Sequence, residues 1–175
     1  MGTPIPSRPD TTEYAPPYET YIKLVPEQDI LTQLEQQIEG TLALLRDVSE
    51  AEAETQHAPY TWSVKQVVGH LIDCERIFGV RALRFARHDS TALPGFDENP
   101  YVEHARFDAR PLGSLAQEFE LVRRSHLLFF RGLDGDAWLR SGVANGHSVT
   151  VRALAYIIAG HERHHVNILH KRLAR

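Results

Sequence analysis

Two histidines spaced one helical turn apart are the residues of this chain best suited to binding a metal ion. His161 and His165 lie within 151–168, where apolar residues recur at three- and four-residue steps. Side chains four residues apart project from the same face of a helix, so both imidazoles can reach one ion. His70 occupies a similar apolar seam within 67–77. We therefore predict a divalent-metal site made of His70, His161 and His165, against the alternative that each is a hydrogen-bonded core histidine.

Two further residues near these histidines are candidates for chemistry. Residues 161–165 match H-E-x-x-H, the pattern of zinc peptidases in which the glutamate acts as general base. A peptidase is disfavoured because Lys171 stands where metzincins have a third histidine and no substrate-binding sheet is predicted. Glu162 is still a candidate catalytic base, with a solvated helix face as the alternative. Cys74 is either a soft fourth ligand or a small buried apolar residue.

The hydrophobic period indicates the elements that position these side chains. Apolar residues at helical spacing predict four helices, over about 27–47, 63–88, 114–132 and 150–172. Two capping boxes mark helix starts, because Ser63 with Gln66 and Ser114 with Gln117 can exchange hydrogen bonds with the first turn. The sequence therefore predicts an all-α protein, a four-helix bundle.

The length of one connection predicts the topology of this bundle. Residues 89–112 form a link much longer than the roughly 2–8 residues usual between adjacent antiparallel helices. Such a crossover can run the length of the bundle, which favours an up-down-down-up topology. His70 and His165 each lie seven residues from a helix end, and in this topology those ends coincide. Both are then roughly 10 Å from one rim, so we expect the histidines at one level of the bundle core, reached from that rim.

An aromatic residue at this rim and a cationic residue at nearly the depth of the histidines are candidates for binding a substrate. Trp62 is expected to form a wall for an apolar electrophile, with a plug at the bundle end as the alternative. Arg123 is expected to neutralise an anionic thiol or carboxylate, with a solvated arginine as the alternative.

Composition and charge exclude several classes of protein. The net charge of −4 argues against binding nucleic acid through its phosphates. The single cysteine excludes an internal disulfide, no apolar run approaches the ~20 residues of a membrane span, and no secretory signal is evident, so we expect a cytoplasmic protein. Six of the ten prolines fall in the first 26 residues, which predicts an extended arm over 1–26 ahead of a bundle domain over 27–175.

Three motifs give the chain a family resemblance. They are Trp62-Ser-Val-Lys-Gln-Val-Val-Gly-His70, then Pro94-Gly-Phe-Asp-Glu, then Gly160-His-Glu-Arg-His-His165. In this order and spacing the chain resembles the DinB-like superfamily, and within it the YfiT branch of metal-dependent hydrolases and bacillithiol S-transferases. The resemblance implies a four-helix bundle of up-down-down-up topology and zinc or nickel on His70, His161 and His165. It also implies a homodimer and, in some relatives, a low-molecular-weight thiol as co-substrate.

Two functions of different classes follow from these observations. Three neutral histidines leave a divalent ion with an open position, which is typical of catalytic sites. We therefore expect a metal-dependent enzyme, a thiol S-transferase or a hydrolase acting on a small electrophile. The alternative is a non-catalytic metal-binding stress-response bundle that acts by self-association or partner binding.

Overall fold

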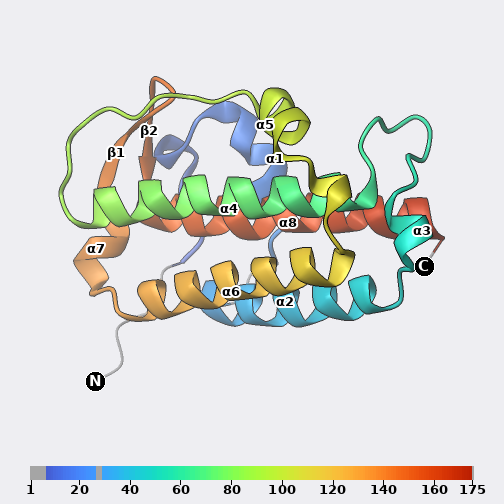
Figure 1. Cartoon of the computed structure of the whole chain (residues 1–175). Helices are drawn as coiled ribbons and strands as arrows, with labels where there is room; N and C mark the ends of the chain where they lie inside the picture. Colours follow the sequence, from blue (N-terminus) through green and yellow to red (C-terminus); the bar gives the residue numbers. More distant parts are fainter. Residues whose placement is uncertain (1–6, 27–28, 175) are drawn as a thin grey trace.

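Four long helices form the body of the molecule in the computed structural model, which describes residues 7–26 and 29–174. They are α2 (Ile30–Arg46), α4 (Val64–Ala86), α6 (Leu112–Arg131) and α8 (Val151–Leu173). Helix α4 packs on α6 and α8, and α2 packs on the same two helices, so the four close into a bundle (Figure 1). The all-α four-helix prediction is confirmed. The predicted start of the first helix, at residue 27, lies outside the described residues.

The direction of the helices confirms the predicted topology. In Figure 1, α4 and α6 run the same way, while α2 and α8 run the opposite way. A long crossover joins the end of α4 to the start of α6. It carries the short helix α5 (Glu98–Ala105) and a 3-10 turn, Phe107–Ala109, where the sequence predicted a loop. Helix α5 is too short to show a hydrophobic period, and its clearest signal is the Asp97 cap, whose carboxylate accepts from the Asn99 amide.

One of the two predicted capping boxes is present. Ser63 caps α4 by accepting from the Gln66 amide, and the Gln66 side chain accepts from the Ser63 amide. The box at Ser114 is wrong, because α6 begins two residues earlier, at Leu112. The Leu112 amide is instead satisfied by Glu50, which precedes α4 in sequence and lies 2.8 Å away. A cap supplied by a distant segment leaves no local sequence pattern.

Over residues 7–26 the N-terminal segment is not the extended arm that its prolines predicted; residues 1–6 of that predicted arm lie outside the described residues. It forms 3-10 turns at Thr11–Glu13 and Pro16–Tyr18 and the short helix α1 (Glu19–Ile22). Proline fits the first turn of a helix because no donor is needed there. The segment packs along α8, and Ile22 is fully buried. The Tyr21 backbone approaches Gly160 so closely that a Cβ on Gly160 would meet the Tyr21 carbonyl oxygen at 2.1 Å.

A β-hairpin packs beside the part of the crossover that follows α4. Strands β1 (Ser141–Ala144) and β2 (His147–Thr150) pair antiparallel through a tight turn at Asn145–Gly146. Both turn residues have positive φ, 52° and 77°, as a two-residue hairpin turn requires. The Leu93 amide donates to the Val143 carbonyl at 2.9 Å, which ties the crossover to this hairpin.

Two short helices, α3 (Glu50–Ala53) and α7 (Gly135–Leu139), complete the connections. None of the helices in the described part of the chain is both long and apolar enough to cross a membrane.

Candidate metal centre

Three histidines from two helices converge at one point of the structure. His70 comes from α4, and His161 and His165 come from consecutive turns of α8. One ring nitrogen from each lies within 4.8 Å of the others, and the Nε2 atoms of His70 and His161 are 3.0 Å apart. His70 and His161 are buried, while His165 is partly exposed. The helical spacing therefore brings together the three rings that the sequence singled out.

Burial sets the protonation of these rings. It lowers the pKa of His70 to about 4. Burial, with the neighbouring imidazoles as lesser causes, lowers the pKa of His165 to about 3 and that of His161 well below its usual value. All three rings are therefore neutral at pH 7 and offer lone pairs.

The donor set fits a divalent ion of the zinc type. Metal–imidazole bonds of about 2.0–2.1 Å place neighbouring donor nitrogens roughly 3 Å apart, as found between His70 and His161. Among the described residues this group has three members and no fourth histidine, cysteine or carboxylate within reach. Cys74 is not a member of this group. Its thiol is buried, with Sγ 3.6 Å from His70 Nδ1 and 3.7 Å from His70 Nε2.

The histidines face the side of the bundle, not its core. They line a cavity of about 310 Å³ between α4 and α8. Its other walls come from the N-terminal segment, the crossover and the hairpin tip, which lie on one side of the α4–α8 pair in Figure 1. The sequence predicted that the histidines lie in the bundle core and are reached from its rim. For the cavity that all three histidines share, both predictions are wrong. A separate cavity at the rim reaches His165 but neither of the other two.

Aromatic side chains wall this cavity around the histidines. The Trp62 ring centre lies 4.9 Å from that of His70, and the Tyr21 ring centre lies 5.2 Å from that of His161. Trp62 thus lies beside the site, and its predicted role in binding a substrate stays a prediction. Tyr18 and Tyr21 were missed because the segment that carries them was expected to be an extended arm.

The structure separates Arg123 and Glu162 from the cavity, so their predicted roles in binding and catalysis are wrong. Arg123 is fully buried in the bundle interior, where Nε and Nη2 donate to the two Glu75 oxygens at 2.6 and 2.8 Å. Its Nη1 lies 2.7 Å from Glu162 Oε2, and the Thr41 hydroxyl donates to Glu162 Oε1 at 2.6 Å. Consecutive residues on a helix point about 100° apart. Glu162 therefore faces the bundle interior while His161 faces the cavity.

This buried ionic cluster of Glu75, Arg123, Glu162 and Thr41 is the polar feature that sequence reasoning missed. Each member lies on an inward face of a different helix, α4, α6, α8 or α2. The one sequence signal for this cluster was the presence of charged residues at positions that the helical period places on inward faces. Which charges pair depends on how the helices pack.

Comparisons with known proteins agree with this architecture. The family model described as the DinB superfamily matches residues 33–169. A solved structure of YfiT from Bacillus subtilis, described as a "probable metal-dependent hydrolase with an unusual four-helix bundle topology", is similar over 99% of this chain and 97% of its own, with a TM-score of 0.72 and 15% identity. The crystal structure of a mycothiol-dependent maleylpyruvate isomerase is similar over 83% of this chain, with a TM-score of 0.67 and 16% identity; the match spans 61% of the isomerase. No curated protein sequence gave a significant match.

Proposed function

Because the chain belongs to the DinB superfamily, we propose that it is a divalent-metal-dependent enzyme that transfers a thiol to a small electrophile. His70, His161 and His165 would hold the ion, which fits zinc or nickel. The observation that carries the proposal is the convergence of three neutral imidazoles on one wall of a cavity. A purely structural metal site is closed by four protein ligands, whereas this group has three. The non-catalytic alternative has no comparable observation in its favour.

The residues around the histidines suit an organic electrophile. When bound, an ion of this type supplies Lewis acidity that favours the deprotonated form of a thiol or a water molecule. The chain itself supplies an apolar surface: the rings of Tyr18, Trp62, Phe78 and Phe96 line the cavity. Hydrolysis by the same centre is the second candidate, since an activated water needs the same open position. In the proposed reaction, the thiol that is transferred is a low-molecular-weight co-substrate.

Turnover with and without metal tests this function. Protein purified without added metal is analysed for zinc and nickel and then assayed with monochlorobimane and a panel of low-molecular-weight thiols. We expect thiol-dependent turnover that a chelator abolishes and added metal restores. His161→Ala should lose both metal and turnover, whereas His104→Ala, an exposed histidine of α5, should keep both. Bound metal with no turnover of any thiol or of a simple ester would contradict an enzymatic role.

A further inference from the structure

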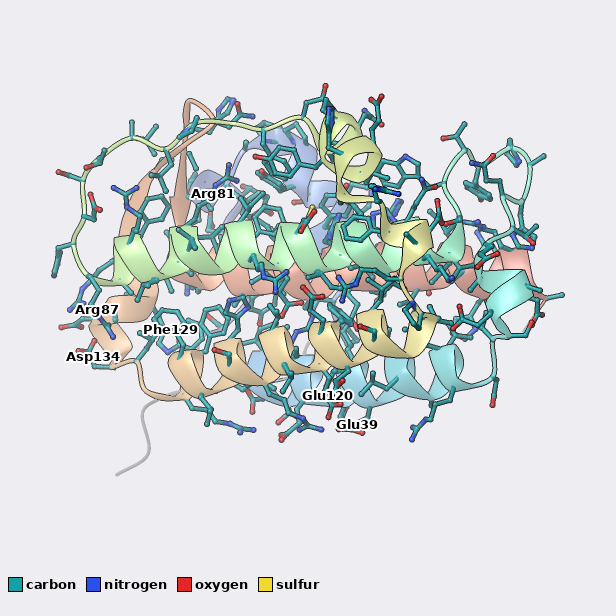
Figure 2. The ribbon with its side chains drawn as sticks, in the orientation of Figure 1. Glu39, Arg81, Arg87, Glu120, Phe129 and Asp134 are labelled. Atoms are coloured by element: carbon teal, nitrogen blue, oxygen red, sulfur yellow. The ribbon has the colours of Figure 1, made fainter. Side chains whose placement is uncertain are left out.

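The cavity that holds the three histidines also holds a buried cation. Arg81 lies three turns along α4 from His70 and lines the same cavity. It is only 4% exposed. Figure 2 shows Arg81 on the side of α4 that faces the crossover. The arginine is therefore inside the molecule, at the opposite end of the cavity from the histidines.

Arg81 has no carboxylate partner among the residues that the structure describes. Its guanidinium lies near two aromatic rings, 5.8 Å from the centre of Phe78 and 5.9 Å from that of Phe96. Nη2 donates to the Pro94 carbonyl at 2.9 Å, the one hydrogen bond of this side chain within the described chain. A guanidinium has five N–H donors, so most of them are available to a ligand. By contrast, Arg84 on the next turn is paired with Asp89.

An unpaired buried cation is costly unless something in the cavity compensates for it. The carboxylate among the lining residues, Glu98, is exposed and does not lie within 4.0 Å of Arg81. A planar carboxylate from a ligand can accept two parallel N–H bonds from a guanidinium, and the rings of Phe78 and Phe96 beside Arg81 carry no charge that competes for it. The Arg81 end of the cavity thus offers N–H donors of a geometry that suits a small carboxylate.

The two ends of the cavity are close enough for one small molecule to reach both. The Arg81 guanidinium carbon lies 5.8 Å from the centre of the Phe78 ring, and that ring centre lies 6.1 Å from the centre of the His161 ring. The Arg81 guanidinium carbon and the centre of the His161 ring are therefore no more than about 12 Å apart. A chain of a few carbon atoms spans this gap.

We propose that Arg81 is a substrate-binding residue and that one of the two reactants carries a carboxylate a few bonds from its reacting atom. The identity of the reaction rests on the proposed function, but binding of the carboxylate at Arg81 does not. Either the thiol or the electrophile could supply this group. The experiment therefore separates binding from turnover and tests both reactants.

Binding is measured by calorimetry with thiols that differ only in their far end. The probes are 3-mercaptopropionate and 6-mercaptohexanoate, each paired with the mercapto alcohol of equal length. We expect the metal-loaded protein to bind one acid about tenfold to hundredfold more tightly than its alcohol. Arg81→Gln should remove this preference and leave the alcohol's affinity unchanged. Arg81→Lys should keep part of it, and Arg84→Gln, the control on the same helix, should keep all of it.

Turnover identifies which reactant carries the carboxylate. One arm pairs an acidic thiol with monochlorobimane, and the other pairs a neutral thiol with 4-(bromomethyl)benzoate or its methyl ester. In the second arm a sulfur–carbon bond forms as the carbon–bromine bond breaks; bromide leaves with the bond pair and the thiol proton passes to the buffer. If Arg81 binds the thiol's carboxylate, Arg81→Gln should raise KM for the acidic thiol about tenfold or more in the first arm. If it binds the electrophile's carboxylate, the same rise in KM should appear for 4-(bromomethyl)benzoate in the second arm. In either arm kcat should change little.

The results distinguish this inference from the proposed function. Adipate and its diamide are titrated into chelator-treated protein, where no metal chemistry is possible. Adipate binding that depends on Arg81 supports the inference even if no turnover is found. Equal affinity for acid and alcohol in the wild type overturns it, and so does a preference that survives Arg81→Gln. If Arg81→Gln weakens acid and alcohol alike, Arg81 merely anchors the crossover and the inference is wrong.

Discussion

At the scale of single residues, burial decides what the three cavity-facing imidazoles can do. No carboxylate among the described residues is hydrogen-bonded to His70, His161 or His165, so nothing stabilises their charged forms. Neutral rings are the form that binds a metal ion, and protons compete with the ion for the same nitrogens. The arrangement that suits metal binding therefore also makes the protein sensitive to acid.

Stability should fall as the pH decreases from about 6.5 to about 4. The unfolded histidines titrate near 6.5, whereas the pKa of folded His70 is about 4 and that of His165 about 3. Below 6.5 the unfolded chain gains protons that the folded protein does not, so unfolding becomes more favourable. Calorimetric Tm measured in steps across this range checks the expectation. His70→Gln should flatten the dependence, and His104→Ala should leave it unchanged; the reverse pattern would contradict the assignment.

Trp62→Ala should weaken substrate saturation without loss of metal. The Trp62 ring lies 4.9 Å from His70 but offers no ligand atom, so its removal opens the wall and leaves the three nitrogens in place. We expect KM for an aromatic electrophile to rise several-fold while metal content, measured by elemental analysis, stays at the wild-type level. A fall in metal content would show that Trp62 supports the ligands themselves.

At the scale of elements, α8 is buried on almost every side over its first half. Residues 153–162 are all buried, because the bundle covers one face and the N-terminal segment covers the other. One face carries Glu162 into the ionic cluster, and the other carries His161 into the cavity. A single helix thus joins two polar sites that do not share a cavity.

Arg123→Ala should destabilise the bundle by about 3–5 kcal/mol, because it leaves two buried carboxylates without their cation. Urea denaturation measures the loss. Arg124→Ala is the matched control: Arg124 is exposed and pairs with Glu39 and Glu120, which lie on the surface of α2 and α6 away from the crossover (Figure 2). We expect little change for Arg124→Ala. An equally small change for Arg123→Ala would show that the buried cluster contributes little to stability.

Gly160→Ala should detach the N-terminal segment from α8. The new Cβ would lie 2.1 Å from the Tyr21 carbonyl oxygen, so the backbone of α1 must move. We expect a cost of roughly 1–3 kcal/mol. Amide exchange over residues 14–25 should become faster. Gly40→Ala in α2 is the control, because a Cβ there meets nothing within 4 Å and should be neutral or stabilising. Unchanged exchange in the Gly160 variant would contradict the close packing.

At the scale of the whole molecule, the cavity lies outside the bundle core, between the α4–α8 pair and the segments that cover it. Three segments that are distant in sequence cover the α4–α8 pair: the N-terminal segment, the crossover and the hairpin (Figure 1). Since these segments line the cavity beside the histidines, we expect the metal and the segments to stabilise each other. The homodimer implied by the family resemblance stays a prediction, which sedimentation equilibrium can test.

Removing the metal should lower the Tm of the whole molecule. An ion bound only by the folded protein stabilises it by mass action, and its ligands join α4 to α8. At pH 7.5 we expect a chelator to lower Tm by several degrees and stoichiometric metal to restore it. His161→Ala should melt at the chelator-treated value and gain nothing from added metal. A wild-type Tm indifferent to chelator would mean that the ion contributes little to the fold.

The sequence by itself determined the four helices, their up-down-down-up order and the convergence of His70, His161 and His165. These follow from local periods, a connection length and the rise per residue, all of which are properties of short stretches of chain. Only the tertiary structure decided which way the histidines face, where Arg81 and Arg123 lie, and what the prolines of the first segment do. The reason is physical: the interior position of Arg123 depends on finding Glu75 and Glu162 on other helices, and the cavity exists because distant segments cover α4 and α8.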